Sequence, residues 1–171
     1  MGSSAAEQVL KYSIDTSMLI HAWYVAYVPA RIPSFWKCLD DLIQRGVIRA
    51  PFEVKQELRR QQEEKKKEAE GAQQDIYRWF SQRDEFFVKA TEEILEYASE
   101  IARKFPKLVR KTTPREVADP YVIALARAES CTVVSQEKPK PKTINIPSVC
   151  GYYDIRYIDL FDFVKEQDWF I

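Results

Sequence analysis

The chain has 171 residues, of which 46% are hydrophobic, so it is long enough to bury a core, and its length predicts a single domain. Its 26 basic and 26 acidic residues give a formal net charge of zero, which excludes a global field that attracts nucleic acid or a membrane. Three scattered cysteines and one histidine argue against a zinc site, and no apolar run approaches the roughly 20 residues of a membrane span, so we expect a cytoplasmic protein with reduced thiols and no membrane partner.

The first strand is expected at the N-terminal end of the domain. Residues 1–11 do not form a signal peptide, and we interpret them as a tag remnant or a disordered N-terminus. Tyr12 to Asp15 predict a short strand, after which Thr16 and Ser17 are expected to cap a helix. An acid at the end of a hydrophobic strand points to function rather than packing.

A second strand–helix unit follows an expected helix over about residues 34–45, for which Gly46 provides a stop. Residues 47–50 predict the second strand, and Pro51 is expected to start the next helix. That helix carries Glu53 and Glu57 one turn apart on a common face.

A long helical region is expected over about residues 59–112. It opens with the run from Arg59 to Gly71, RRQQEEKKKEAEG, which is typical of a solvated helical extension. Thr91 is expected to cap a later helix with apolar residues at helical spacing, and Thr113 to Glu116 have the form of a capping box.

Residues 117–138 predict a helix followed by a buried strand. Asp119 suits the N-cap position and Pro120 the first helical position, and Thr132 to Val134 are β-branched, as in a buried parallel strand. Glu137 then falls just past that strand. The last elements are expected to be a short helix over about 147–153, a strand over 156–158 and a closing helix. This alternation of strands and helices predicts one α/β domain over residues 12–171, with three α/β/α layers and a central, mostly parallel sheet of four to five strands.

Four acids occupy comparable places in this scheme: Asp15, Glu57, Asp119 and Glu137. If the strands are parallel neighbours, three of these acids lie at the carboxyl edge of the sheet, and Glu57 leans over it. Clustered carboxylates repel one another unless a cation lies between them, and Mg²⁺ or Mn²⁺ prefers oxygen ligands. Such an ion activates a bound water for attack on a phosphate, so no catalytic Ser, Cys or His is needed.

Each acid also has a structural interpretation. Taken alone, Asp119 is better explained by capping and Glu57 by a place on the helix surface, with Glu53 as its rival. Glu137 is explained by an ion pair with Lys138. His21 fits a core or rim position better than metal binding, and the tryptophans and tyrosines fit the core better than base stacking, with Trp23 and Tyr24 as the candidate exceptions.

The ordered set of segments resembles the PIN domain, and a prokaryotic PIN-like branch in particular. The resemblance covers almost the whole chain and is carried by Tyr12 to Ser17, Pro51 to Leu58, Ala118 to Pro120, Thr132 to Lys138 and Asp159 to Asp162. It implies a metal-dependent ribonuclease fold, often dimeric and often the toxin of a toxin–antitoxin pair. RNA is then the substrate, and a small antitoxin protein is the expected partner of a homodimer.

The resemblance assigns catalysis to Asp15, Glu57, Asp119 and Glu137, with Asp15, Asp119 and Glu137 holding Mg²⁺ or Mn²⁺. Ser17 and Ser135 are implied supports for the acids or for bound water. The fourth position departs from the family pattern, in which Ser or Thr precedes an aspartate by two residues, because Glu137 stands there. A catalytically weak or inactive PIN-like module that binds RNA or protein is therefore the alternative.

Phosphate contacts are expected from a local patch, because the net charge is zero. Lys138 and Lys140 lie in a proline-rich loop beside the expected site, and Arg115 precedes Asp119. Such cations bind a phosphate backbone without reading sequence, although ordinary solubility charges explain them equally. Other carboxylate-dependent phosphotransfer folds fit less well, because Asp15-Thr16-Ser17 lacks the second acid of a dehalogenase-type Asp-x-Asp and no acid pair precedes Asp15 as in a receiver domain.

Overall fold

The computed structural model describes residues 9–66, 76–109 and 118–171. Its centre is a five-stranded sheet in the order β3-β2-β1-β4-β5, in which every pair of neighbours is parallel. The strands are β1 (Tyr12–Ile14), β2 (Ile48–Pro51), β3 (Phe87–Val88), β4 (Thr132–Val134) and β5 (Tyr157–Ile158). The expected three-layer α/β fold is confirmed, and the predicted four to five strands are five.

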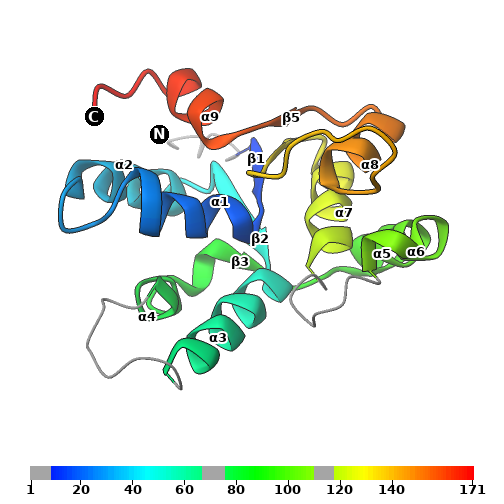
Figure 1. Ribbon diagram of the computed structural model, residues 1–171, viewed down its shortest axis with the longest axis horizontal. Coiled ribbons are helices and arrows are strands. Elements are labelled where there is room, and N and C mark those ends of the chain that lie inside the picture. The colour runs from blue at the N-terminus through cyan, green and yellow to red at the C-terminus, as the bar shows by residue number, and fades with distance from the viewer. Residues whose placement is uncertain (1–8, 67–75, 110–117) are drawn as a thin grey trace, which may run out of the picture.

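Helices lie on both sides of the sheet (Figure 1). One side carries α1 (Thr16–His21), which continues into a π-helical turn over Ala22–Ala26, and α2 (Pro33–Gln44). The other carries α7 (Asp119–Glu129), which packs on β1, β2 and β4, and α5 (Glu92–Lys104), which packs on α7. The remaining helices are α3 (Phe52–Lys66), α4 (Ile76–Ser81), a 3-10 turn (Asp84–Phe86), α6 (Pro106–Val109), α8 (Ile146–Tyr152) and α9 (Leu160–Glu166).

Several expected boundaries are confirmed. Gly46 follows α2 with a φ of 69°, a left-handed conformation that glycine adopts at little cost. The hydroxyl of Thr91 accepts a hydrogen bond from Ile94 N at 3.3 Å and caps α5. The polar run after Arg59 is helical up to Lys66, whereas the proposed capping box of residues 113–116 lies outside the described residues.

Other boundaries were wrong. Asp15, not Thr16 or Ser17, is the N-cap of α1, because its extended backbone lets its carboxylate accept from Ser17 N at 3.3 Å. Asp119 is the first residue of α7 rather than its N-cap, which is Ala118. Pro51 ends β2 instead of starting α3, because its backbone remains in register with Val88 of β3, a two-residue strand that was not predicted.

The tryptophans belong to the core. Trp23 is 4% exposed, and its ring lies 4.7 Å from that of Trp36, which in turn lies 5.1 Å from that of Trp79. These edge-on contacts are the arrangement that aromatic rings prefer in protein interiors. The core interpretation of Trp23 is therefore confirmed, and base stacking by this residue is excluded by its burial.

Helix α9 allows a matched test of the packing. Phe163 is fully buried, with its ring edge-on to Tyr12 at 5.1 Å, whereas Phe161, two residues away, is 71% exposed. We expect Phe163→Ala to lower the free energy of unfolding by ~3–5 kcal/mol, because it leaves a cavity, and Phe161→Ala to change it by less than ~0.5 kcal/mol. Urea denaturation of both variants measures the difference, and equal effects would contradict the packing.

Candidate functional site

The parallel sheet brings three segments to one edge. Strand β1 lies between β2 and β4, so the residue that follows β1 lies next to the residues that follow β4. Asp15 N donates to Val134 O at 3.0 Å, which extends the pairing of β1 and β4 to this point. Asp15 and Ser135 therefore leave neighbouring strands at the same carboxyl edge, as the sequence predicted.

All four predicted acids line one pocket of about 190 Å³ at this edge. Asp15 and Glu57 are each 3% exposed, and Asp119 is 4% exposed, so all three are withdrawn from bulk water. The surface-helix interpretation of Glu57 is therefore wrong, and its rival Glu53 does not line the pocket. The remaining lining residues are Thr16, Ser17, Ile20 and Gln61.

Two serines hold the carboxylate of Asp15. The hydroxyl of Ser135 donates to Asp15 Oδ2 at 2.8 Å, the hydroxyl of Ser17 makes a short hydrogen bond to the same oxygen, and the two hydroxyls lie 3.1 Å apart. Ser17 Oγ also accepts from Gln136 N at 3.0 Å. These bonds fix Oδ2, whereas Oδ1 of Asp15 makes no hydrogen bond within the described part of the chain.

Glu57 joins three segments around the pocket. Its Oε2 accepts a hydrogen bond from the hydroxyl of Thr16 at 2.5 Å, and its Oε1 accepts from Ala118 N at 3.1 Å. Thr16 follows Asp15 and Ala118 precedes Asp119, so the Glu57 carboxylate positions the segments that carry two other acids. Sequence reasoning missed Thr16, although its place directly after Asp15 is a usable signal.

Glu137 does not form the expected ion pair with Lys138 but accepts a hydrogen bond from the backbone. Its Oε2 accepts a hydrogen bond from Ile146 N, the first amide of α8, at 2.8 Å. Lys138 instead lies 2.7 Å from Asp159 Oδ2, and this contact lowers the pKa of Asp159. The interpretation of Glu137 as the partner of Lys138 is therefore wrong.

Burial raises the pKa of both innermost acids. The pKa of Asp15 is raised by desolvation and by the charge of Glu137, against the hydrogen bonds from Ser17 and Ser135. The pKa of Glu57 is raised to about 7, first by desolvation and further by the charge of Asp15, against the hydrogen bonds from Thr16 and Ala118. Ionisation of the pocket is thus costly without a compensating cation.

The donors suit a hard divalent ion, but they are not gathered into a ligand set. Carboxylate oxygens are the ligands that Mg²⁺ and Mn²⁺ prefer, and Asp15 Oδ1 is available to one. Among the residues that the structure describes, however, no three His, Cys, Asp or Glu side chains are close enough to hold an ion. The acidic side chains therefore have the chemistry and the location that a divalent ion needs, but they have to move closer together to bind one.

The predicted phosphate contacts are only partly described. Lys138 has a side chain that is 60% exposed and is engaged by Asp159, and Lys140 is exposed in the following loop. Arg115 lies outside the described residues. Gln61 was missed, although it lies one turn after Glu57, at the i+4 spacing that places two residues on one helix face.

Comparisons with known proteins find one matching family and similar solved structures. The family described as "Domain of unknown function (DUF4411)" matches residues 12–171. Among solved structures, VapBC-1 from nontypeable Haemophilus influenzae is similar with a TM-score of 0.54 at 13% identity, covering 88% of this chain and 98% of that one. VapBC2 from Rickettsia felis, bound to a DNA fragment from its promoter, is similar with a TM-score of 0.53 at 12% identity and the same coverage.

These likenesses show the fold, which is PIN-like as the sequence predicted. No curated protein matches the chain. None of the described helices is long and apolar enough to cross a membrane.

The raised pKa of Glu57 predicts how stability depends on pH. Between pH 4.5 and about 7 the unfolded chain has released this proton and the folded chain keeps it, so the free energy of unfolding falls as the pH rises. The rise of the Glu57 pKa from 4.5 to about 7 corresponds to a loss of ~3 kcal/mol in the free energy of unfolding by pH 8, and the raised pKa of Asp15 adds a loss of the same sign.

Chemical denaturation without divalent ions at several pH values measures this loss. We expect Glu57→Gln to remove most of it, and Glu63→Gln, an exposed acid on the same helix that pairs with Arg59, to leave it unchanged. An identical pH slope in Glu57→Gln and the wild type would show that Glu57 is not the titrating group.

Proposed function

The chain belongs to the family described as "Domain of unknown function (DUF4411)". We propose that it is a PIN-like, metal-dependent endoribonuclease that hydrolyses RNA phosphodiester bonds. One observation carries the proposal: Asp15, Glu57, Asp119 and Glu137, chosen from four distant parts of the sequence, line a single pocket. Acids buried in this way destabilise a fold unless hydrogen bonds or an opposite charge compensate them, and strongly shifted carboxyl groups in a pocket are typical of catalytic sites.

In this proposal Asp15, Asp119 and Glu137 hold Mg²⁺ or Mn²⁺. When bound, the ion lowers the pKa of water and neutralises charge on the phosphate. Ser17 and Ser135 keep Asp15 in place by fixing its Oδ2, which leaves Oδ1 as the oxygen that would bind the ion. A bound ion would offset the desolvation that raises the pKa of Asp15, and also the smaller repulsion from Glu137.

Glu57 has the pKa of an acid–base catalyst. At a pKa of about 7 the side chain is divided between acid and carboxylate near neutral pH, so it can both accept and return a proton. We assign it the proton of the attacking water. As the water oxygen bonds to phosphorus, the bond from phosphorus to the leaving oxygen breaks, and the proton held by Glu57 passes on to that oxygen.

The substrate is held at the edge of the pocket by cations. We assign phosphate contacts to Lys138, Lys140 and Arg115, of which Lys138 exchanges its bond with Asp159 for a phosphate. Because these contacts do not read bases, sequence selection has to come from elsewhere.

The partners are part of the same proposal. The similar solved structures are VapBC proteins, which supports a toxin of a toxin–antitoxin pair that a small antitoxin protein holds in check. We further propose a cytoplasmic homodimer.

A second candidate function is a catalytically weak or inactive PIN-like module that binds RNA or protein. Two observations favour it. Glu137 replaces the usual aspartate and one of its oxygens is used by Ile146 N, and in the described part of the chain the acids do not form a ready ligand set.

Cleavage separates the two functions. We expect the wild type to cut a mixed single-stranded RNA pool with Mn²⁺, and Asp119→Asn to lower the rate by about 100-fold or more, because it removes a charged ligand. Asp162→Asn, at an exposed acid of α9, is the matched control and should cleave normally. A wild type that is inactive over a wide range of metal concentrations would leave only the binding module.

Ion binding has its own readout in thermal stability. We expect Mn²⁺ to raise the melting temperature more at about pH 8 than at about pH 5, because ionised acids bind the ion and protonated acids do not. Asp15→Asn should remove most of this increase. An increase that survives Asp15→Asn would place the ion somewhere else.

A further inference from the structure

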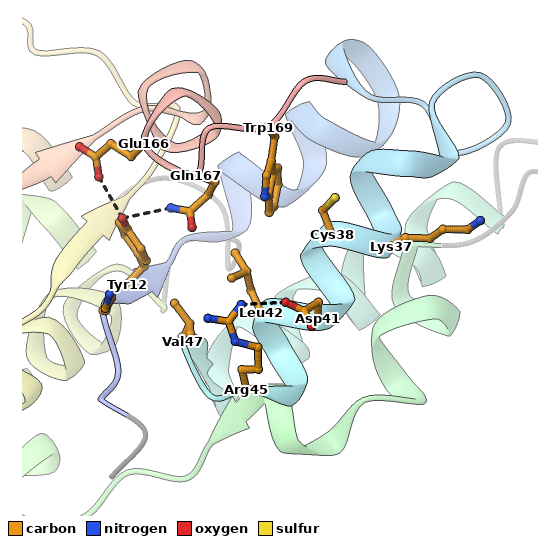
Figure 2. A pocket seen from close by; sticks show the side chains of 11 residues that line it. Tyr12, Lys37, Cys38, Asp41, Leu42, Arg45, Val47, Glu166, Gln167 and Trp169 are labelled. Carbon is orange, nitrogen blue, oxygen red and sulfur yellow. Dashed lines mark hydrogen bonds and ion pairs between the residues drawn. The ribbon is translucent and has the colours of Figure 1, made fainter. Parts of the chain in front are cut away.

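A second and larger cavity, of about 530 Å³, lies at the opposite edge of the sheet from the acid pocket. It is bounded by the start of β1, by α2 and by the chain segment that follows α9 (Figure 2). Its lining comprises Lys11, Tyr12, Lys37, Cys38, Asp41, Leu42, Arg45, Val47, Glu166, Gln167 and Trp169. The proposed nuclease chemistry uses none of these residues.

One wall of this cavity is fixed by hydrogen bonds. Tyr12 is 8% exposed, and its hydroxyl donates to Glu166 Oε2 at 2.9 Å and accepts from Gln167 Nε2 at 3.1 Å. Glu166 is held in turn by Arg156. Because its Nε2 is committed to Tyr12, Gln167 can offer the cavity its carbonyl oxygen, which makes no hydrogen bond to any residue in the described ranges.

An aromatic ring with a fixed orientation forms another wall. The ring of Trp169 stands edge-on to Phe35 at 5.6 Å and to Phe163 at 5.8 Å, so it cannot turn freely. Figure 2 shows it pointing into the cavity above Leu42, which is 5% exposed. The cavity thus pairs a flat aromatic surface with an apolar floor.

The charges at the rim favour an anion. Three lining side chains are cationic and two are acidic, and both acids already have partners: Asp41 lies 2.9 Å from Arg45, and Glu166 pairs with Arg156. Lys11 pairs with no carboxylate among the residues described. Lys37 extends away from the cavity in Figure 2, so Lys11 and the remaining donors of Arg45 are the groups that can meet an anion.

We propose that this cavity binds a nucleoside phosphate, either a free nucleotide or the terminal nucleotide of an RNA strand. The base stacks on Trp169 over the apolar floor and donates an N–H to the carbonyl oxygen of Gln167. The phosphate lies against Lys11 and Arg45. Stacking on an aromatic ring combined with cations on the backbone is the general means of binding single-stranded nucleotides.

The backbone here argues against a peptide as the ligand. A peptide that binds by adding a strand to a sheet needs unpaired main-chain groups at a strand edge. Lys11 N donates to Val47 O at 2.9 Å, and Lys11 O accepts from Thr132 N at 3.0 Å, so the start of β1 is paired on both sides. A compact ligand that bonds through side chains fits this cavity better.

Calorimetric titration of the full chain with each of the four 5′-mononucleotides in EDTA tests the proposal. We expect dissociation constants between micromolar and millimolar for the wild type. Lys11→Ala and Trp169→Leu should each lower the affinity about tenfold, and the affinity of Lys11→Ala should depend less on salt concentration. Lys165→Ala removes an exposed α9 lysine outside the cavity and should bind normally. Asp119→Asn should also bind normally, which separates this site from the acid pocket.

Binding measurements with other ligands identify what the cavity binds. Inorganic phosphate that binds as tightly as the nucleotides would show an anion site and overturn the proposal, as would nucleotide binding that is unaffected by Lys11→Ala, or no binding at millimolar concentration. A short RNA with a 5′-phosphate that competes with mononucleotides identifies a strand end as one source, and failure to compete identifies the free nucleotide. If Trp169→Leu unfolds the chain, Lys11→Ala, on the surface, still decides.

Discussion

The desolvation of two carboxyl groups is the constraint on which the site depends. Asp15 and Glu57 are almost fully buried, and their raised pKa values show that the fold resists their ionisation. A buried acid is tolerated when hydrogen bonds or an opposite charge repay its lost hydration. Here hydroxyl and amide donors compensate part of the lost hydration. Ser17 and Ser135 donate to Asp15, and Thr16 and Ala118 donate to Glu57. The remainder is what a divalent ion offsets, so the same burial that destabilises the pocket favours the ion.

The parallel order of the strands explains why so few residues are enough to bring the acids together. With β1 between β2 and β4, the residues after β1 and β4 meet without any long loop. Ser135 can then reach Asp15 across 120 residues of sequence, and Glu57 reaches the amide beside Asp119. These bonds join the ends of β1 and β4 to each other and helix α3 to the start of α7, so hydrogen bonds between elements of the fold hold Asp15 and Glu57 in place. The cavity at the other edge is built by different elements, which lets the two edges serve separate purposes.

Sequence reasoning could recover the sheet and the acids because both have local signals. Short strand-like runs followed by an acid are visible in the sequence, at residues 12–14 before Asp15 and at residues 132–134 before Glu137, and parallel pairing then implies the proximity of these acids. The contacts of each acid have no such signal. Whether Asp119 caps its helix or begins it depends on the backbone of Ala118, and whether Glu137 meets Lys138 or Ile146 depends on where α8 starts. Strand β3 was missed because two residues have no detectable period, and it is defined only by its pairing with β2.

The glutamate at the fourth position is the departure with the clearest physical consequence. Glu137 lines the acid pocket and also accepts a hydrogen bond from Ile146 N at the start of α8. A negative charge beside the first amides of a helix is favourable, so this contact stabilises the loop between β4 and α8. An aspartate side chain is one methylene shorter, so it would less easily reach both the pocket and the helix at once. The added length lets one carboxylate tie the lysine-bearing loop to the pocket, and it connects the two sets of residues that the proposed reaction needs: those that hold the ion and those that hold the phosphate.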